Sequence, residues 1–266
     1  MAGTAPRADA WVVVEHPEGW GDAPLARSEH GTRVLMARAS REATAAAGGR
    51  TRVWVAHCTP PLGPMLRVGV VDDPRQVAGW DLAGFAAGSH RQWGEPDEDP
   101  LLLVCANGRR DRCCGHAGGR LADRLWALPE GDRVLTSTHL GGHRFAPTAL
   151  LLPWGQLHGR LDEATAAALV PDARQGWTAT ASLRGASTLD APAQVAEVRA
   201  RQVAGYRSLQ PLAVTLEGDA TGDHLDARVT LPDAGVLDVG LTRVTRTLAV
   251  SCGQPPRRTE HWVVRD

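Results

Sequence analysis

Residues 101–115 read LLLVCANGRRDRCCG, an apolar run followed by a basic loop that holds three of the chain's five cysteines. The apolar run is typical of a short buried strand. The segment 115–131, GHAGGRLADRLWALPEG, carries leucines at i, i+4 and i+7, as one face of a helix does. The next segment, RVLTST at 133–138, again resembles a strand. The order predicts a right-handed β-α-β unit with parallel strands.

Two histidines follow the second of these strands, spaced H-x3-H in THLGGH. We expect Cys105 to end the first strand and Cys114 to begin the helix, where free backbone N–H groups and the helix dipole stabilise a thiolate. His139 and His143 fall in the loop after the second strand. Loops that follow adjacent parallel strands emerge at one edge of the sheet, so the two pairs can converge. Such a set suits a zinc ion or a [2Fe–2S] cluster.

The neighbouring residues fit the same interpretation. Gly141 and Gly142 would let the backbone approach something bulky closely. Arg109, Arg110 and Arg112 would favour a thiolate, and they would form a docking patch for an acidic redox partner protein. A solvated arginine face with no partner is the alternative.

Three readings of the cysteines stay open. Structural zinc usually takes tight C-x2-4-C knuckles, whereas the spacing here is C-x8-C on a large domain, which favours a cluster. A zinc-binding structural or interaction protein with the same four ligands is the second reading. The third is a thiol oxidoreductase that uses Cys113 or Cys114 as the attacking thiolate. Cys58 and Cys252 lie in strand-like patterns and are predicted to be core residues.

The chain before residue 96 has a related pattern. Four short β-branched runs predict strands at 11–16, 33–39, 52–58 and 66–71, and 72–88 predicts a helix opened by an aspartate and a proline. Residues 89–100 read as a linker. The segment GTRVLMARA at 31–39 resembles GDRVLTSTH at 131–139, as it would if the first part were a degenerate copy of the second. A chance likeness between two α/β segments is the alternative. The first part offers no cysteine pair and no H-x3-H.

The remaining elements complete the expected organisation. Residues 149–161 predict a hairpin around 153–155, and 162–170 a helix with acids in its first turn. A capped helix at 188–206 precedes strand candidates at 212–218, 224–231, 235–244, 247–253 and 260–266. We expect an α/β fold with an N-terminal lobe at 1–95, a cluster-carrying domain at 96–185 and an α+β appendage at 186–266.

Bulk properties exclude several classes of protein. The net charge of -1 gives no case for nucleic acid or an anionic membrane as a partner. No segment reaches the roughly 18–20 apolar residues of a membrane span, and the N-terminus lacks the apolar stretch of a signal peptide. An odd, clustered set of five cysteines argues against a secreted disulfide framework and predicts a reducing, cytoplasmic setting.

The stretch CANGRRDRCCG, followed by STHLGGHRFAPTALLLPWGQLHGRL, resembles the sucrase/ferredoxin-like family. The resemblance is strongest over 101–161 and extends more weakly to WVVVEHPEGWG at 11–21. It implies a thioredoxin-like [2Fe–2S] ferredoxin in which histidines replace the second cysteine pair. By position, the implied ligands are Cys105, Cys114, His139 and His143. Cys113 stands where the family often has a basic residue, and the glycine after Cys114 favours Cys114 as the ligand.

The resemblance implies a one-electron carrier or redox sensor rather than an enzyme with its own substrate. Histidine ligation raises the potential of such a cluster, and a ligating imidazole can couple electron transfer to proton transfer. The paired carboxylates of glycoside hydrolysis are not apparent.

Overall fold

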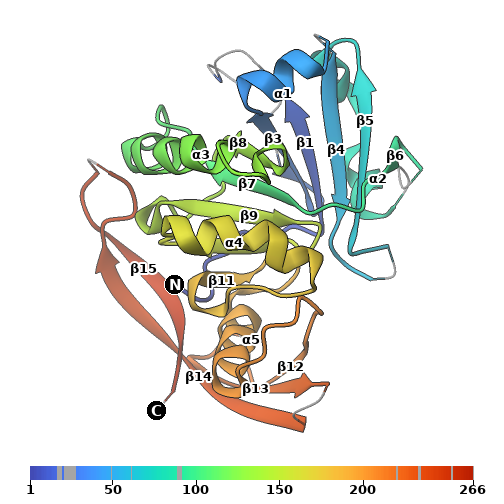
Figure 1. Cartoon of the computed structure of the whole chain (residues 1–266). Helices are drawn as coiled ribbons and strands as arrows, with labels where there is room; N and C mark the ends of the chain where they lie inside the picture. The colour runs from blue at the N-terminus through green and yellow to red at the C-terminus, as the bar shows by residue number, and fades with distance from the viewer. Residues whose placement is uncertain are drawn as a thin grey trace.

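Two sheets organise the chain in the computed structural model, which describes residues 1–16, 20, 28–48, 50–60, 62–88, 92–219, 221–232, 235–252 and 254–265. One is a mixed sheet of eleven strands, and the other is an antiparallel sheet of four strands (Figure 1). The start of the expected linker, residues 89–91, lies outside the described residues. The α/β class predicted from the sequence is confirmed.

The predicted β-α-β unit is present. Its strands β7 and β8 are parallel, and β9 and β10 follow in antiparallel pairing, giving the order β8-β7-β9-β10. The elements are β7 (Leu101–Cys105), a π-helical turn (Cys114–Gly118), α3 (Gly119–Trp126), β8 (Val134–Ser137), β9 (Thr148–Leu152), β10 (Gln156–Gly159) and α4 (Glu163–Arg174).

Strand β7 is buried on both faces, which explains its continuous apolar sequence. Leu102 and Val104 belong to a core cluster with Leu121 and Leu125 of α3. Leu103 packs on the opposite face, in a cluster that extends to Leu35 of the first half. The amphipathic spacing that predicted α3 therefore marks the face that covers β7.

The first half has the same strand order. Its four main strands run β3-β1-β4-β5, with β1 parallel to β3 and antiparallel to β4. The elements are β1 (Ala10–Glu15), β2 (Ser28–Glu29), β3 (Thr32–Arg38), α1 (Arg41–Ala46), β4 (Thr51–His57), β5 (Met65–Val71) and β6 (Glu95–Pro96).

Strands β3 and β8 join the two halves edge to edge, through the antiparallel pairs Ala37↔Ser137 and Arg38↔Thr136. These strands are also the two segments whose sequences resemble each other. The shared order and directions agree with a duplicated unit. The duplication and the domain boundaries stay predictions.

The prediction of a single helix at 72–88 is wrong. The segment forms a 3-10 helix, Pro74–Gly79, and the separate short α2, Leu82–Ala86. Trp80 is extended with ψ 144°, and the Asp81 side chain caps a new helix by accepting from the Gly84 N–H. An aspartate that satisfies free N–H groups begins a helix, so the chain is interrupted there.

The C-terminal part combines one edge strand of the large sheet with a separate sheet packed on α5. The strand β13 alternates exposed and buried residues, with the buried set facing α5. The elements are β11 (Leu183–Ala186), α5 (Ala191–Ala204), β12 (Ala213–Glu217), β13 (His224–Leu231), β14 (Gly235–Leu248) and β15 (Arg257–Val264).

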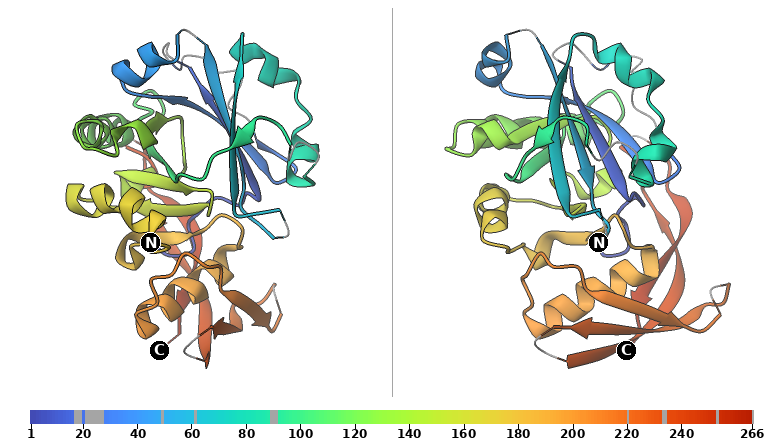
Figure 2. Two further views of the ribbon diagram at one scale, coloured as in Figure 1. Left: turned by 45° about the vertical axis from the view of Figure 1, so that its right-hand side comes forward. Right: turned by 90° about the vertical axis from the view of Figure 1, so that its right-hand side faces the viewer.

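The strands expected at 235–244 and 247–253 are wrong in their bounds. Strand β14 is continuous to Leu248, and Cys252 lies exposed in the connection to β15 instead of in the core. The hairpin of β14 and β15 belongs to the C-terminal sheet. Its far end extends beyond β12 and β13 and runs along the side of the second half (Figure 2).

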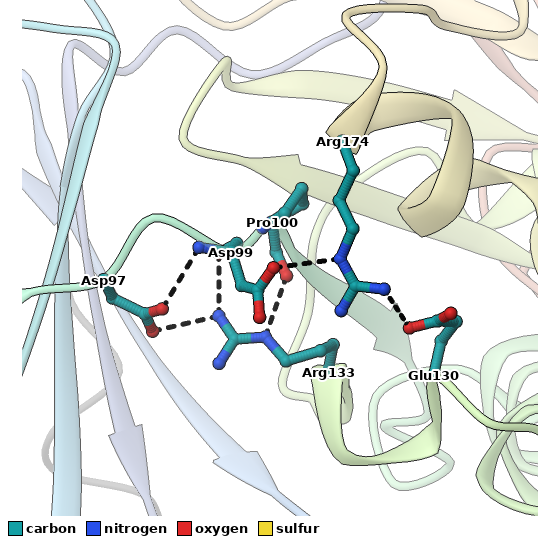
Figure 3. Close-up of polar contacts among 6 residues, drawn as sticks. All are labelled: Asp97, Asp99, Pro100, Glu130, Arg133 and Arg174. Atoms are coloured by element: carbon teal, nitrogen blue, oxygen red, sulfur yellow. Dashed lines mark hydrogen bonds and ion pairs between the residues drawn. The ribbon is translucent and has the colours of Figure 1, made fainter.

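An arginine network fixes the end of the expected linker (Figure 3). Arg133 donates from Nε to the Pro100 carbonyl at 3.0 Å and from Nη2 to Asp97 Oδ2 at 2.9 Å. Arg174 of α4 donates to Asp99 Oδ1 at 2.9 Å and also contacts Glu130. These contacts hold the start of β7, and therefore its register beside β8.

Among the described residues, no helix has both the length and the apolar character that a bilayer span requires.

His158 gives the fold a testable pH dependence. It is fully buried on β10, and its Nδ1 lies 2.9 Å from the Ser182 hydroxyl. Burial, helped by the charge of Arg184, lowers its pKa from 6.5 to about 3. Because the folded-state pKa is the lower one, the unfolded chain takes up the proton first as the pH falls below 6.5. The stability that the buried neutral His158 contributes is therefore fully present above pH 6.5, and it is lost as the pH falls towards 3.

We expect the free energy of unfolding of the wild type to drop by about 2 kcal/mol more than that of His158→Gln between pH 7 and pH 5. Glutamine keeps a hydrogen bond to Ser182 and does not titrate. Urea unfolding at both pH values measures the difference. Parallel pH profiles for the two proteins would contradict the assignment.

Candidate metal centre

The centre forms where β7 and β8 end. Cys105 is the last residue of β7 and pairs with Ser137, the last residue of β8, so both loops leave the sheet at the same edge. The helical turn that follows packs directly on this edge. A Cβ at Gly118 would lie 2.0 Å from the Cys105 carbonyl oxygen, which only glycine permits. This approach places Cys114 beside the end of β7.

Cys105 and Cys114 lie against each other. Both are buried, with 1% of each residue exposed, and their side chains hydrogen-bond to each other. The hydrogen bond from Cys114 holds the pKa of Cys105 well below its ordinary value, against the effect of burial, and the His139 side chain adds to it. The same hydrogen bond raises the pKa of Cys114. The hydrogen bond therefore makes Cys105 the more acidic thiol of the pair and Cys114 the less acidic one.

The two histidines lie together. The ring centroids of His139 and His143 are 4.9 Å apart with an interplanar angle of 38°. The Nδ1 atoms of both rings are buried and have no hydrogen-bond partner among the described residues. Since His139 also contacts Cys105, the structure brings all four sequence-predicted ligand residues to one place. A buried nitrogen without a partner is costly unless a ligand satisfies it.

Asp111 supports this site and was missed as a functional residue by the sequence reasoning. Its buried carboxylate accepts from the Cys113 N–H at 3.0 Å, the Ser251 hydroxyl at 2.8 Å and the Cys252 N–H at 3.0 Å. Burial would raise the pKa of Asp111, but these hydrogen bonds bring it below the ordinary value. Its signal in the sequence is the aspartate of NGRRD, which lies between the two predicted cysteine ligands.

The Asp111 carboxylate also faces His143. Its Oδ2 lies 3.7 Å from His143 Nε2, on the opposite side of the ring from the free Nδ1. Burial lowers the pKa of His143, although Asp111 acts in the opposite direction. The ring is therefore neutral near pH 7, the state in which an imidazole binds a metal.

A disulfide joins Cys113 to Cys252, which lie 139 positions apart in the sequence. The sequence did not predict this bond, and the expectation that Cys252 is a core residue is wrong. No local pattern relates two residues so distant, since only the packing of the β14–β15 hairpin brings them together. Cys113 is engaged there, whereas the adjacent Cys114 contacts Cys105.

Asp111, Cys113 and Cys252 form the one group of three or more potential metal-binding side chains in the described part of the chain whose ligand atoms all lie within 4.8 Å of one another. Two of these atoms are the bonded sulfurs of the disulfide. A disulfide sulfur is not the thiolate that binds metals, so this group becomes a ligand set only after reduction.

The histidine loop, residues 138–147 between β8 and β9, packs on Arg184 through Gly142. Gly142 has φ 70°, and a Cβ on it would lie 2.3 Å from Arg184 Nη2, so the glycine is required by this guanidinium. Gly141, with φ 79°, has no described atom within 4 Å of its Cβ position. Arg184 is fully buried and donates to the Gly141 carbonyl at 3.0 Å. Burial lowers its pKa to about 10, and Cys105 acts in the opposite direction.

The other predicted positions lie around the centre. Arg109, Arg110 and Arg112 are exposed on the loop between the two cysteines, and His116 is exposed on the helical turn. Cys58 is buried as predicted, and burial raises the pKa of its thiol. Sequence reasoning also missed Arg184, for which no local signal exists.

A model of the sucrase/ferredoxin-like family, designated Suc_Fer-like, matches residues 1–185. The match covers both halves of the large sheet and all four converging side chains, and it ends before α5. No curated protein matches the chain. No solved structure matches it either.

The disulfide should stabilise the fold measurably. Cys252→Ser is expected to lower the free energy of unfolding by about 2–4 kcal/mol, because the crosslink restricts the unfolded chain over a long loop. Urea unfolding in buffer without thiols measures the loss. Dithiothreitol should bring the wild type to the stability of the variant and leave the variant unchanged. A wild type indifferent to dithiothreitol would show that the bond contributes nothing.

Proposed function

The chain belongs to the sucrase/ferredoxin-like family, and we propose that it holds one [2Fe–2S] cluster through Cys105, Cys114, His139 and His143, as an electron carrier or redox sensor. The observation that carries the proposal is the pair of buried Nδ1 atoms without partners among the described residues, next to two buried cysteines that hydrogen-bond to each other. When bound, the cluster supplies a one-electron acceptor whose potential histidine ligation raises.

The donor set fits such a group. Both cysteines must be thiolates to bind a metal, and the lowered pKa of Cys105 makes it the readier of the two to lose its proton. His143 offers Nδ1 while the Asp111 carboxylate faces Nε2. A carboxylate behind a ligating imidazole fixes the ring orientation and raises the basicity of the ring.

The spacing supports a cluster over a single zinc ion. Tetrahedral zinc with sulfur and nitrogen ligands requires all ligand atoms about 3.5 Å from one another. Among the described residues, no three of the four side chains place their ligand atoms within 4.8 Å of each other. A two-metal cluster spans the wider arrangement.

Charged residues around the centre would favour its reduced form. Two thiolates and two neutral imidazoles carry two fewer negative charges than four thiolates. Arg184 adds a buried cation close to the cysteines, and it acts in the direction that stabilises added negative charge. The exposed Arg109, Arg110 and Arg112 lie on the loop between Cys105 and Cys114. They would contact an acidic redox partner.

A cytoplasmic location is part of the proposal. Disulfides that occur in reducing compartments are usually catalytic or redox-sensing. The Cys113–Cys252 bond lies next to the ligand Cys114, which supports a sensing role for this region.

The metal content tests the proposal directly. We expect the purified protein to be brown, to contain two irons and two acid-labile sulfides per chain, and to bleach with dithionite. A colourless protein with one zinc per chain would establish the zinc reading instead. A colourless, metal-free protein with a reactive low-pKa thiol would indicate a thiol oxidoreductase.

The ligand assignment has its own test. His139→Cys and His143→Cys should each retain the cluster and lower its midpoint potential, by on the order of 100 mV, because each exchange adds a negative charge. Redox titration followed by visible absorption measures the shift. His116→Gln, a change of the exposed neighbour, should leave the potential where it is. An unchanged potential in both cysteine variants would remove the histidines from the ligand set.

A further inference from the structure

A cationic cleft lies between the histidine loop and the β14–β15 hairpin. It consists of two hollows of about 660 Å³ and 390 Å³ whose walls share Thr4, Arg144, Phe145 and His261. The larger hollow is also lined by His143, so the cleft borders the candidate metal centre. Concave sites of this size accommodate small molecules.

The charge of the cleft is one-sided. Five arginines line it: Arg110, Arg144, Arg160, Arg246 and Arg257. Within the described part of the chain, none of the five has a carboxylate at ion-pair distance, and Glu260 is the one acid in the walls. That acid lies 3.7 Å from Arg243. The positive charge in the cleft is therefore not neutralised by the protein itself.

Two of the five arginines, Arg144 and Arg160, are stacked on the Phe145 ring before any ligand arrives. The guanidinium of Arg144 lies 4.7 Å from the centroid of the Phe145 ring, and that of Arg160 lies 5.5 Å from it. The Arg160 N–H also donates to the Phe145 carbonyl at 2.6 Å. Cation–π stacking of this kind fixes guanidinium planes and leaves their edges free to bind anions.

His261, on the opposite wall, is also affected by the positive charge of the cleft. Burial lowers its pKa, and the nearby charges of Arg144 and Arg246 lower it further. The wall it belongs to is anchored to the second half, because Cys252 of the same hairpin is bonded to Cys113.

We propose that this cleft binds a small polyanion, a molecule with at least two phosphate or carboxylate groups. Guanidinium groups bind both by paired N–H···O bonds, and several guanidiniums in one cleft favour a multiply charged ligand over a single anion. A protein surface is a poorer fit, since its acidic side chains would have to enter a recess between two elements. The proposal goes beyond the cluster and does not depend on it.

Isothermal titration of the purified full-length protein with inorganic pyrophosphate, at low ionic strength, tests the proposal. We expect saturable binding of one pyrophosphate per chain, and weaker binding of inorganic phosphate. Arg160→Gln and Arg246→Gln should each weaken it at least about tenfold, the expected effect of losing a charge-assisted hydrogen bond. Citrate in place of pyrophosphate distinguishes the two chemistries, since the tighter of the two identifies phosphate or carboxylate as the group recognised.

Arg199→Gln is the matched control, because Arg199 is an exposed arginine of α5 that does not line the cleft. It should bind pyrophosphate as the wild type does. The proposal is overturned if neither pyrophosphate nor citrate binds saturably at millimolar concentration. It is equally overturned if binding persists unchanged in both cleft variants, or falls as much in Arg199→Gln.

Discussion

The parallel pairing of β7 with β8 is the constraint on which the rest depends. The register sets Cys105 beside Ser137, and the two loops that carry the predicted ligands leave from that single edge. A slip of one residue would turn every side chain of β7 to the opposite face. Strand β7 is buried on both sides, so its register is fixed by packing in the core. The contacts of Arg133 and Arg174 also hold the segment before it, at the protein surface.

The C-terminal part completes the centre, although the family match ends at residue 185. Asp111 is satisfied by donors from Ser251 and Cys252, and the adjacent disulfide holds these donors in place. The same carboxylate faces His143. The connection between β14 and β15 therefore touches His143 in two ways, through the Asp111 carboxylate and through the backbone of Val250. Reduction of the disulfide would loosen both this contact and one wall of the cationic cleft.

The charges of this protein are unevenly distributed, although its net charge is close to zero. The whole chain carries -1, yet Arg184 is buried at the cysteine pair and five further arginines line the neighbouring cleft. Acids elsewhere pair with other arginines, as Asp99 does with Arg174 and Asp172 with Arg207. A local field of this sign favours both added electrons and bound anions, so the proposed cluster and the proposed polyanion site would act on each other.

The sequence by itself determined the β-α-β unit, the positions of the four converging side chains and the apolar faces, because spacing along a helix or strand fixes which residues share a face. It also indicated the likeness between 31–39 and 131–139. Only the tertiary structure decided the pairing of Cys113 with Cys252, the burial of Arg184 and the division of residues 72–88 into two short helices. Contacts between residues more than a hundred positions apart leave no local periodicity, and they form only when whole elements pack.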